Sequence, residues 1–221
     1  MIEAFIFDLD GVITDTAHFH YLAWKELGDR LGIDIDEKFN ESLKGISRME
    51  SLERILIHGK KENYFDKEEK LIMADDKNNY YVSLIENINP KDVLPGIVEL
   101  LESIKLNNIK IGLASASKNA IKVLNNLKLI DYFDFISDAS KCENSKPAPD
   151  IFLMAAKGLS VNPKNCIGIE DASAGIESIN KAGMYSVGVG NFEILKKAKY
   201  IVKDTDELIF EKIVEKYSKD L

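Results

Sequence analysis

The stretch AFIFDLDGVITDT, residues 4–16, begins as an unbroken apolar run and ends among carboxylates. The run AFIF predicts a strand that is buried on both faces of a sheet, and Gly11 predicts the turn at which the chain leaves that strand. Asp8 and Asp10 therefore stand at the carboxyl end of the strand. Because they are two residues apart, an extended chain turns both side chains the same way, so both can face one bound atom.

Length and composition favour a globular protein. The 221 residues are enough for a substantial core and fit one domain that carries an insertion. The net charge of -8 argues against a nucleic-acid partner and leaves small anionic ligands open. No apolar run reaches the length of a membrane span, and the first residues lack the basic lead of a signal peptide. We therefore expect a cytoplasmic protein with no membrane partner and, by default, a monomer.

The two cysteines, Cys142 and Cys166, form no metal-ligand pattern. Cys166 opens the apolar run CIGIE, where a small buried residue suits a strand. Reduced thiols are the expectation for a cytoplasmic chain, with a disulfide between the two as the alternative.

Residues 16–89 show helical patterns. A first helix is predicted over 16–31, where apolar residues recur at helical spacing before a stop at Gly32. Further helical patterns cover 47–59 and 66–87, with no convincing strand between them. The segment is therefore predicted to be an all-helical insertion, a cap domain.

Beyond Pro90 and Pro95 the chain changes character, and strands alternate with helices. Strands are predicted over 109–115, 133–137, 166–170 and 185–190, and helices over 97–104, 118–127, 150–159 and 173–183. Such alternation predicts a parallel sheet with crossover helices, with which the first strand must pair. The predicted fold class is α/β, a Rossmann-like parallel sheet core (residues 1–15 and 90–221) with an inserted helical cap domain (residues 16–89).

Polar side chains are predicted to collect at the carboxyl ends of these strands, which is where open parallel sheets bind ligands. They follow four strands in turn: Asp8 and Asp10, Ser115 and Ser117, Lys146, and Glu170 with Asp171. Carboxylates at this density favour a hard divalent cation with oxygen ligands, and Mg²⁺ is the expected ion.

This group of side chains suits phosphoryl transfer. A carboxylate beside Mg²⁺ can attack phosphorus and hold an aspartyl phosphate, while a second carboxylate moves protons for an alcohol or water. Asp8 fits the first role and Asp10 the second. Lys146 can neutralise the nucleophile, and Ser115 can donate to a phosphoryl oxygen. A further anion site is predicted where the next helix starts, at Ser117, Lys118 and Asn119.

Four short motifs resemble, in order, those of the haloacid dehalogenase superfamily: DLDGVITDT, SAS, KPAPDIF and GIEDASAGI. The resemblance covers nearly the whole chain and implies that Mg²⁺ is held by Asp8, the Asp10 carbonyl, Glu170 and Asp171. Three further stretches resemble the phosphosugar mutases of that superfamily: TDTAHFHYLAWKELGDRLGI, LKGISRMESLERIL and LASASKNA. Those enzymes interconvert β-D-glucose 1-phosphate and glucose 6-phosphate through an aspartyl-phosphate enzyme, with β-glucose 1,6-bisphosphate as intermediate and activator.

The same resemblance implies roles for residues of the cap. Thr16 lies at the hinge, and His20 supports Asp10 when the cap closes. Lys77 resembles a sugar-contacting lysine. The other cap contacts with the sugar phosphate fall on one stretch, at Lys44, Gly45, Ser47, Arg48 and Ser51.

Some of these residues also have simpler interpretations. Lys44 and Arg48, four apart, can form one solvated helix face, and His20 alone can be a structural histidine. Asp15 is interpreted as the cap of the first helix rather than as part of the site. GVGNFE, residues 188–193, is interpreted as a turn rather than as a dinucleotide-binding motif.

Two other functions stay open. A Mg²⁺-dependent sugar-phosphate phosphatase of the same fold would use the same aspartates and metal but deliver water to the aspartyl phosphate. A non-catalytic regulator would have no need of an intact nucleophile, acid and metal set. Disaccharide phosphates are alternatives to glucose phosphate as the substrate.

Overall fold

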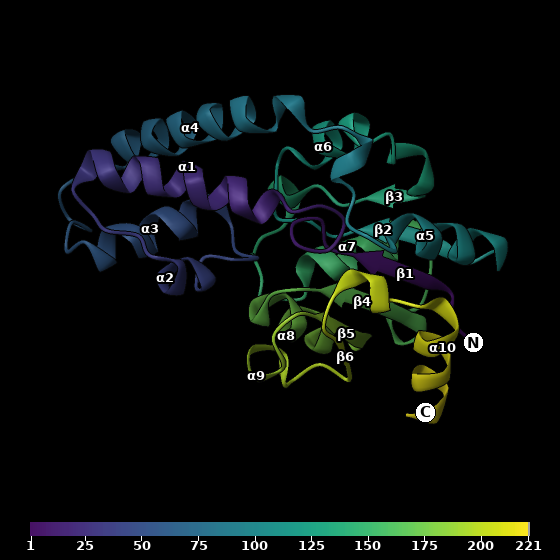
Figure 1. Ribbon diagram of the computed structural model, residues 1–221. Coiled ribbons are helices and arrows are strands. Elements are labelled where there is room, and N and C mark those ends of the chain that lie inside the picture. The colour runs from purple at the N-terminus through teal and green to yellow at the C-terminus, as the bar shows by residue number, and fades with distance from the viewer. Residues whose placement is uncertain (221) are drawn as a thin grey trace.

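Six parallel strands form one sheet in the computed structural model, which describes residues 1–220 (Figure 1). The order across the sheet is β3-β2-β1-β4-β5-β6, so the first strand pairs with β2 on one side and with β4 on the other. The predicted α/β class with a parallel sheet is confirmed. The strands are β1 (Ala4–Phe7), β2 (Lys110–Leu113), β3 (Phe135–Ile136), β4 (Cys166–Glu170), β5 (Tyr185–Val189) and β6 (Tyr200–Val202).

The central strand β1 is buried along its whole length, as its apolar sequence predicts. Phe5 and Phe7 belong to one hydrophobic cluster, whereas Ala4 and Ile6 belong to another. The alternation follows from the pleat of a strand, which sends successive side chains to opposite faces. The sheet therefore separates two cores, and Asp8 follows directly at its carboxyl edge.

Helices cover both faces of the sheet. On the face of Phe5 and Phe7, apolar residues come from α5, α6 and α10, and on the other face they come from α7, α8 and α9. Such three-layer packing is the usual way to bury a parallel sheet. The helices are α5 (Ile97–Leu106), α6 (Ala120–Asn126), α7 (Asp150–Leu159), α8 (Ser173–Lys181), α9 (Phe192–Leu195) and α10 (Phe210–Lys219).

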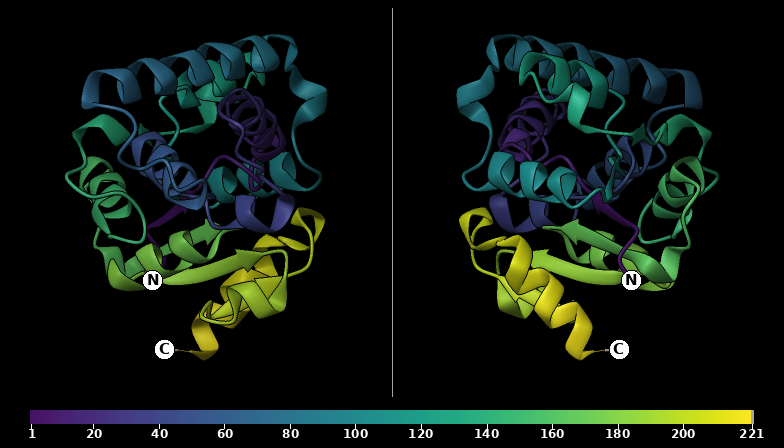
Figure 2. Two further views of the ribbon diagram at one scale, coloured as in Figure 1. Left: turned by 90° about the vertical axis from the view of Figure 1, so that its left-hand side faces the viewer. Right: turned by 90° about the vertical axis from the view of Figure 1, so that its right-hand side faces the viewer.

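Four further helices form a block with a core of its own, beside the carboxyl edge of the sheet (Figure 1). They are α1 (Thr16–Leu31), α2 (Glu37–Glu41), α3 (Arg48–His58) and α4 (Lys67–Leu84), and residues 16–89 contain no strand. Trp24 and Ile55 are among the residues buried between them. Figure 2 shows α4 at the top of both views and α10 at the bottom. None of the helices in residues 1–220 combines the length and apolar character needed to cross a membrane.

The structure corrects several local expectations. Asp15 stands at the first position before α1, but its side chain accepts no hydrogen bond from that helix, so it is not the cap that its residue type suggested. The strand predicted over 133–137 is only two residues long, and helix α6 begins at Ala120 instead of 118. Within 188–193, where a turn was predicted, only Gly190 and Asn191 lie outside regular structure, because Val189 ends β5 and Phe192 begins α9. The start of α9 is capped by the side chain of Asn191.

Candidate active site

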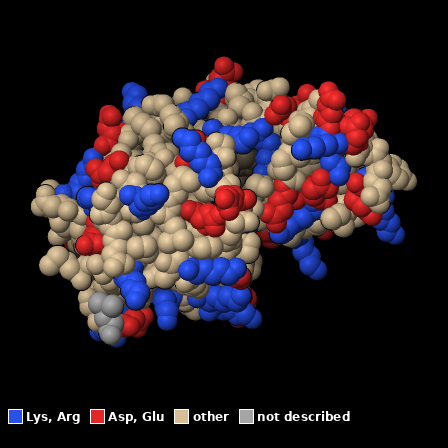
Figure 3. Space-filling view, turned by 180° about the vertical axis from the view of Figure 1, so that it is seen from behind, with Lys and Arg blue, Asp and Glu red and all other residues tan. Residues whose placement is uncertain are grey.

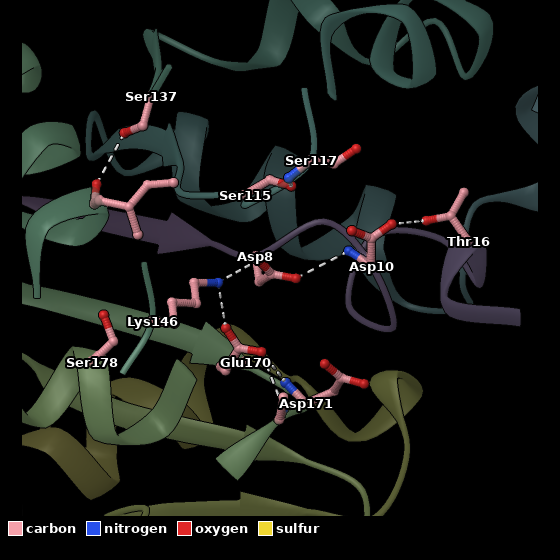
Figure 4. Close-up of polar contacts among 12 residues, drawn as sticks. Asp8, Asp10, Thr16, Ser115, Ser117, Ser137, Lys146, Glu170, Asp171 and Ser178 are labelled. Carbon is pink, nitrogen blue, oxygen red and sulfur yellow. Dashed lines mark hydrogen bonds and ion pairs between the residues drawn. The ribbon is translucent and has the colours of Figure 1, made fainter. Parts of the chain in front are cut away.

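A buried lysine bridges two buried carboxylates at the carboxyl edge of the sheet (Figure 4). Nζ of Lys146 lies 2.6 Å from Oδ1 of Asp8 and 2.8 Å from Oε2 of Glu170. Asp8 follows β1, Glu170 ends β4, and Lys146 comes from the loop between β3 and α7. Asp8 and Glu170 meet because β1 and β4 are neighbours in the sheet, whereas Lys146 reaches them from the loop that follows the edge strand β3. Removing one partner from such a buried charge group lowers the stability of the folded protein strongly, because it leaves a buried charge without a counter-charge.

The electrostatics of this group follow from burial. Burial and the charge of Glu170 raise the pKa of Asp8 to about 8, although Lys146 opposes the change. Burial and the nearby carboxylates of Glu170 and Asp8 also hold the pKa of Asp171 well above its usual range. Burial lowers the pKa of Lys146, but the two carboxylates outweigh it and raise that pKa above the ordinary value, so Lys146 stays charged.

Asp8, Glu170 and Asp171 form a donor set that fits a divalent cation. Each offers a carboxylate oxygen, and these oxygens lie within 4.8 Å of one another. Carboxylates are the ligands that hard cations such as Mg²⁺ prefer, and a bound dication would relieve their mutual repulsion. Of the four ligands that the resemblance implies, three form this cluster, and Asp10 was assigned only through its carbonyl.

Two glycines let the carboxylates come this close. A Cβ on Gly175, inside α8, would lie 1.9 Å from Oε2 of Glu170. A Cβ on Gly11 would lie 2.3 Å from Oδ2 of Asp171, and Gly11 also has a φ of +80°, which favours glycine. The backbone itself supports Glu170, whose Oε1 accepts from the N–H groups of Asp171 and Ala172 at 3.2 and 3.1 Å.

Asp10 is oriented by the first turn of α1. The hydroxyl of Thr16 donates to Oδ1 of Asp10, and Nε2 of His20 lies 3.8 Å from the same oxygen. Burial raises the pKa of Asp10, although the bond from Thr16 opposes that change. The predicted neighbours Thr16 and His20 are therefore both beside Asp10.

Lys77 is buried among aromatic rings behind His20. Its Nζ lies 2.8 Å from Nδ1 of His20, 4.5 Å from the ring centre of Trp24 and 5.1 Å from that of Tyr81. Burial and the charge of Arg48 lower the pKa of Lys77 to about 7. Burial, followed by the charges of Lys77 and Arg48, holds the pKa of His20 well below its usual range.

A cavity separates the helical block from the edge of the sheet, and most of the predicted site residues line it. In the space-filling view from behind, Lys and Arg side chains surround a hollow in the surface (Figure 3). The predicted residues on the cavity wall are Asp8, Asp10, His20, Lys44, Gly45, Ser47, Arg48, Ser51, Lys77, Ser117, Lys118, Asn119 and Asp171. The others, Thr16, Ser115, Lys146 and Glu170, are buried behind it and contact its residues.

The stretch 44–51 closes over the sheet from the helical side. Lys44 lies in the turn before α3, not on one helix with Arg48, so a shared solvated helix face is ruled out. Nζ of Lys44 is 2.8 Å from Oε1 of Glu41 and 3.8 Å from Oδ2 of Asp171. Gly45 has a φ of +73°, and a Cβ on it would lie 3.5 Å from Cβ of Ala172, the residue before α8.

Several wall residues were not predicted from sequence. Trp24, Leu43 and Ile46 form an apolar part of the cavity wall. Trp24 and Leu43 also belong to the core of the helical block. As apolar residues they indicate burial in that core, but not a place on the cavity wall. Their second role depends on how the block lies against the sheet, which no local pattern encodes.

Comparison with known proteins gives one consistent family. Residues 2–183 match the family model of haloacid dehalogenase-like hydrolases. A relative named β-phosphoglucomutase from Bacillus subtilis is 49% identical over 98% of this chain and 96% of its own. A crystal structure described as β-phosphoglucomutase from Clostridium difficile has 68% identity and a TM-score of 0.98, covering 100% of this chain and 99% of that one. A phosphorylated carbohydrates phosphatase from Thermotoga maritima is 30% identical over 83% of this chain and 82% of its own.

Proposed function

The chain belongs to the haloacid dehalogenase-like hydrolase family, and from that premise we propose that it works as a β-phosphoglucomutase. It interconverts β-D-glucose 1-phosphate and glucose 6-phosphate through an aspartyl-phosphate enzyme and β-glucose 1,6-bisphosphate. The relative that is 49% identical over nearly the whole chain supports this activity rather than the phosphatase alternative. A non-catalytic regulator is disfavoured because nucleophile, acid and metal-binding carboxylates are all present.

The observation that carries the proposal is the make-up of the cavity wall. It combines Asp8, the candidate nucleophile, with a second set of anion-binding groups, namely Arg48, Ser117, Lys118 and Asn119. A sugar bisphosphate carries two phosphoryl groups, and this wall offers a partner for each. Residues 16–89 then act as the cap and residues 1–15 with 90–221 as the catalytic core.

In the proposed reaction Asp8 is the nucleophile. Its carboxylate oxygen attacks phosphorus of the bisphosphate, the bond between phosphorus and the sugar oxygen breaks, and the aspartyl phosphate forms. Lys146, 2.6 Å from Asp8, offsets the negative charge of the carboxylate and of the incoming phosphoryl oxygens. Ser115, which is buried beside Ser117, can donate to another phosphoryl oxygen.

The family and the donor set indicate a divalent metal, and we propose Mg²⁺. Asp8, Glu170, Asp171 and the carbonyl of Asp10 would hold it. Once bound, it supplies positive charge for the transferred phosphoryl group.

Asp10 is the proposed general acid and base. It gives a proton to the sugar oxygen that leaves phosphorus, and it takes a proton from the other sugar hydroxyl when that hydroxyl attacks the aspartyl phosphate. Its raised pKa suits a group that must hold a proton in one half-reaction. Thr16 and His20 orient it.

Product analysis tests the function. Purified protein is incubated with β-glucose 1-phosphate, Mg²⁺ and a trace of β-glucose 1,6-bisphosphate, and glucose 6-phosphate and free phosphate are followed together. We expect glucose 6-phosphate with little free phosphate. Free phosphate alone would identify a phosphatase, and the absence of both products would contradict the proposed substrate.

The Asp8→Asn variant tests covalent catalysis. It keeps the size of the side chain but removes the nucleophile, so the rate is expected to fall by about 10³-fold or more. Asp15→Asn is the control, because Asp15 is exposed and lies off the wall of the active-site cavity. An Asp8→Asn variant as active as the parent would contradict the aspartyl phosphate.

A further inference from the structure

The side-chain carbonyl of Asn78 joins the helical block to the sheet side of the molecule. Its Oδ1 accepts a hydrogen bond from Nη2 of Arg48 at 2.7 Å and another from Nδ2 of Asn119 at 2.8 Å. Arg48 is the first residue of α3, whereas Asn119 lies in the loop between β2 and α6. One oxygen atom of α4 thus holds two donors that come from opposite sides of the cavity.

Both donors also belong to the cavity wall, next to Ser117 and Lys118. Among residues 1–220 that wall does not include Asn78, which contacts the two donors without lining the cavity. A guanidinium carries five N–H donors and a carboxamide nitrogen carries two. After bonding to Asn78, Arg48 and Asn119 therefore keep N–H groups for a bound anion.

The neutrality of the amide matters at this position. Asp75, one turn earlier on α4, has Oδ1 at 3.3 Å from Nη1 of Arg48, but its side chain is 77% exposed, so water screens its charge. A carboxylate at position 78 would be half-buried and in direct contact with the guanidinium. It would compete with a bound phosphate for that charge.

We infer that Asn78 is a positioning residue for the phosphate that is not being transferred. It aims Arg48 of the cap and Asn119 of the core at one anion, so that phosphate binding and closure of the cavity favour each other. The inference rests on the proposed function, in which the bound sugar carries such a phosphate. Because this phosphate is held alike in the ground state and the transition state, loss of Asn78 raises KM and leaves kcat nearly unchanged.

The Asn78→Ala variant tests this, because alanine removes the amide and favours a helix. KM for β-glucose 1-phosphate is expected to rise about tenfold, the effect of a lost hydrogen bond to a charged donor. The value of kcat is expected to stay within about twofold of the parent. Asn79→Ala is the matched control, since Asn79 is the next residue of α4 and is exposed. A fall in kcat at unchanged KM would show a merely structural role and overturn the inference.

A double variant tests the bridge itself. In the Asn119→Ala background, Asn78→Ala is expected to raise KM by a smaller factor than it does in the parent, because part of its action passes through Asn119. If the factors by which the two substitutions raise KM multiply in the double variant, the two residues act independently and the proposed bridge is wrong. Asn78→Asp keeps the acceptor oxygen but adds a charge, so it is expected to raise KM more than alanine does. A parental KM in that variant would overturn the argument from charge.

Calorimetric titration with glucose 6-phosphate separates this inference from the proposed function. The affinity of Asn78→Ala for this probe is expected to be about tenfold lower than that of the parent. A parent protein that neither binds the probe nor produces it would refute the proposed function. If the parent binds and produces glucose 6-phosphate but the Asn78→Ala variant has the same affinity and KM as the parent, only the role of Asn78 is refuted.

Discussion

Among single residues, Lys77 combines a place on the cavity wall with almost complete burial. The resemblance places it at the sugar, and it does line the cavity. Its ammonium group is surrounded by His20 and Trp24 of α1 and by Tyr81 of α4, so this environment depends on how the two helices pack against each other. Only 2% of Lys77 is exposed, so the ammonium group loses most of its hydration in the folded protein.

Because Lys77 is buried, the free energy of unfolding is predicted to depend on pH. The Lys77 pKa of about 7 in the folded protein lies below the ordinary lysine value of 10.5, so between these pH values the unfolded chain binds a proton that the folded chain does not. Stability therefore rises with pH across this window, and below pH 7 the full cost of the buried charge applies. Lys77→Met is expected to stabilise the protein at pH 6 on the order of 3 kcal/mol, because each pKa unit corresponds to about 1.4 kcal/mol and some contacts are lost.

Urea unfolding of parent and variant at several pH values measures this difference. The advantage of Lys77→Met should shrink as the pH rises from 7 toward 10.5. The same substitution at exposed Lys67, the first residue of α4, is the control. An advantage that stays constant across the window would mean that Lys77 carries no buried charge.

At the scale of elements, regular strands and helices were predictable because their patterns are local. The run AFIF becomes the buried strand β1, and CIGIE becomes β4 with every residue buried. Strand β6 was not predicted, since the three residues Tyr200–Val202 carry too short a pattern. Helix α10 was also not predicted, although its buried residues Ile213 and Tyr217 recur at helical spacing. The role of Gly175 could not be predicted either. Its sequence shows a glycine within a helix, and only the packing of α8 on β4 shows that a side chain there would strike Glu170.

Gly175→Ala is predicted to damage the candidate metal site. Alanine favours a helix more than glycine does, but its Cβ would overlap the Glu170 carboxylate and displace it. The Mg²⁺ concentration for half-maximal mutase activity is expected to rise about tenfold or more. Gly158→Ala in α7 is the matched control, because its Cβ would strike the ring of Phe135, which is outside the carboxylate cluster. If both variants lost stability and kept the parental Mg²⁺ requirement, the contact with Glu170 would be irrelevant to the metal.

At the scale of the whole molecule, the candidate site depends on how the helical block lies against the sheet. The carboxylate cluster could be predicted from the sequence, because parallel strands bring their carboxyl ends together at one edge. The contacts across the cavity could not be predicted from the sequence. They join side chains from segments whose local sequence patterns carry no information about one another. Another contact between the helical block and the sheet side, outside the cavity wall, runs from Ser145, whose hydroxyl donates to Oε2 of Glu50 at 2.6 Å. Ser145 precedes Lys146, so this contact joins α3 to the loop that carries Lys146, for which we propose a catalytic role.

Ser145→Ala is predicted to change the partition of the aspartyl phosphate between sugar and water. The variant loses the bond to Glu50, which keeps Arg54 as a partner at 2.6 Å and is therefore not left unpaired. A more weakly held cap admits water more often, and water then competes with the sugar hydroxyl for the phosphoryl group. The ratio of free phosphate to glucose 6-phosphate is expected to rise about threefold to tenfold, as for the loss of one hydrogen bond.

The product ratio, rather than the rate, is the measurement that isolates this contact. A disturbance of Lys146 would slow transfer to sugar and to water alike, whereas a loosened cap favours water. Ser140→Ala is the control, because the hydroxyl of Ser140 bonds Asp138 within the same loop and reaches no residue of the cap. An unchanged ratio in Ser145→Ala would show that closure does not depend on Glu50. The partition would then have to be set by other contacts between the helical block and the sheet side, among them those from Lys44 to Asp171 and from Asn78 to Asn119.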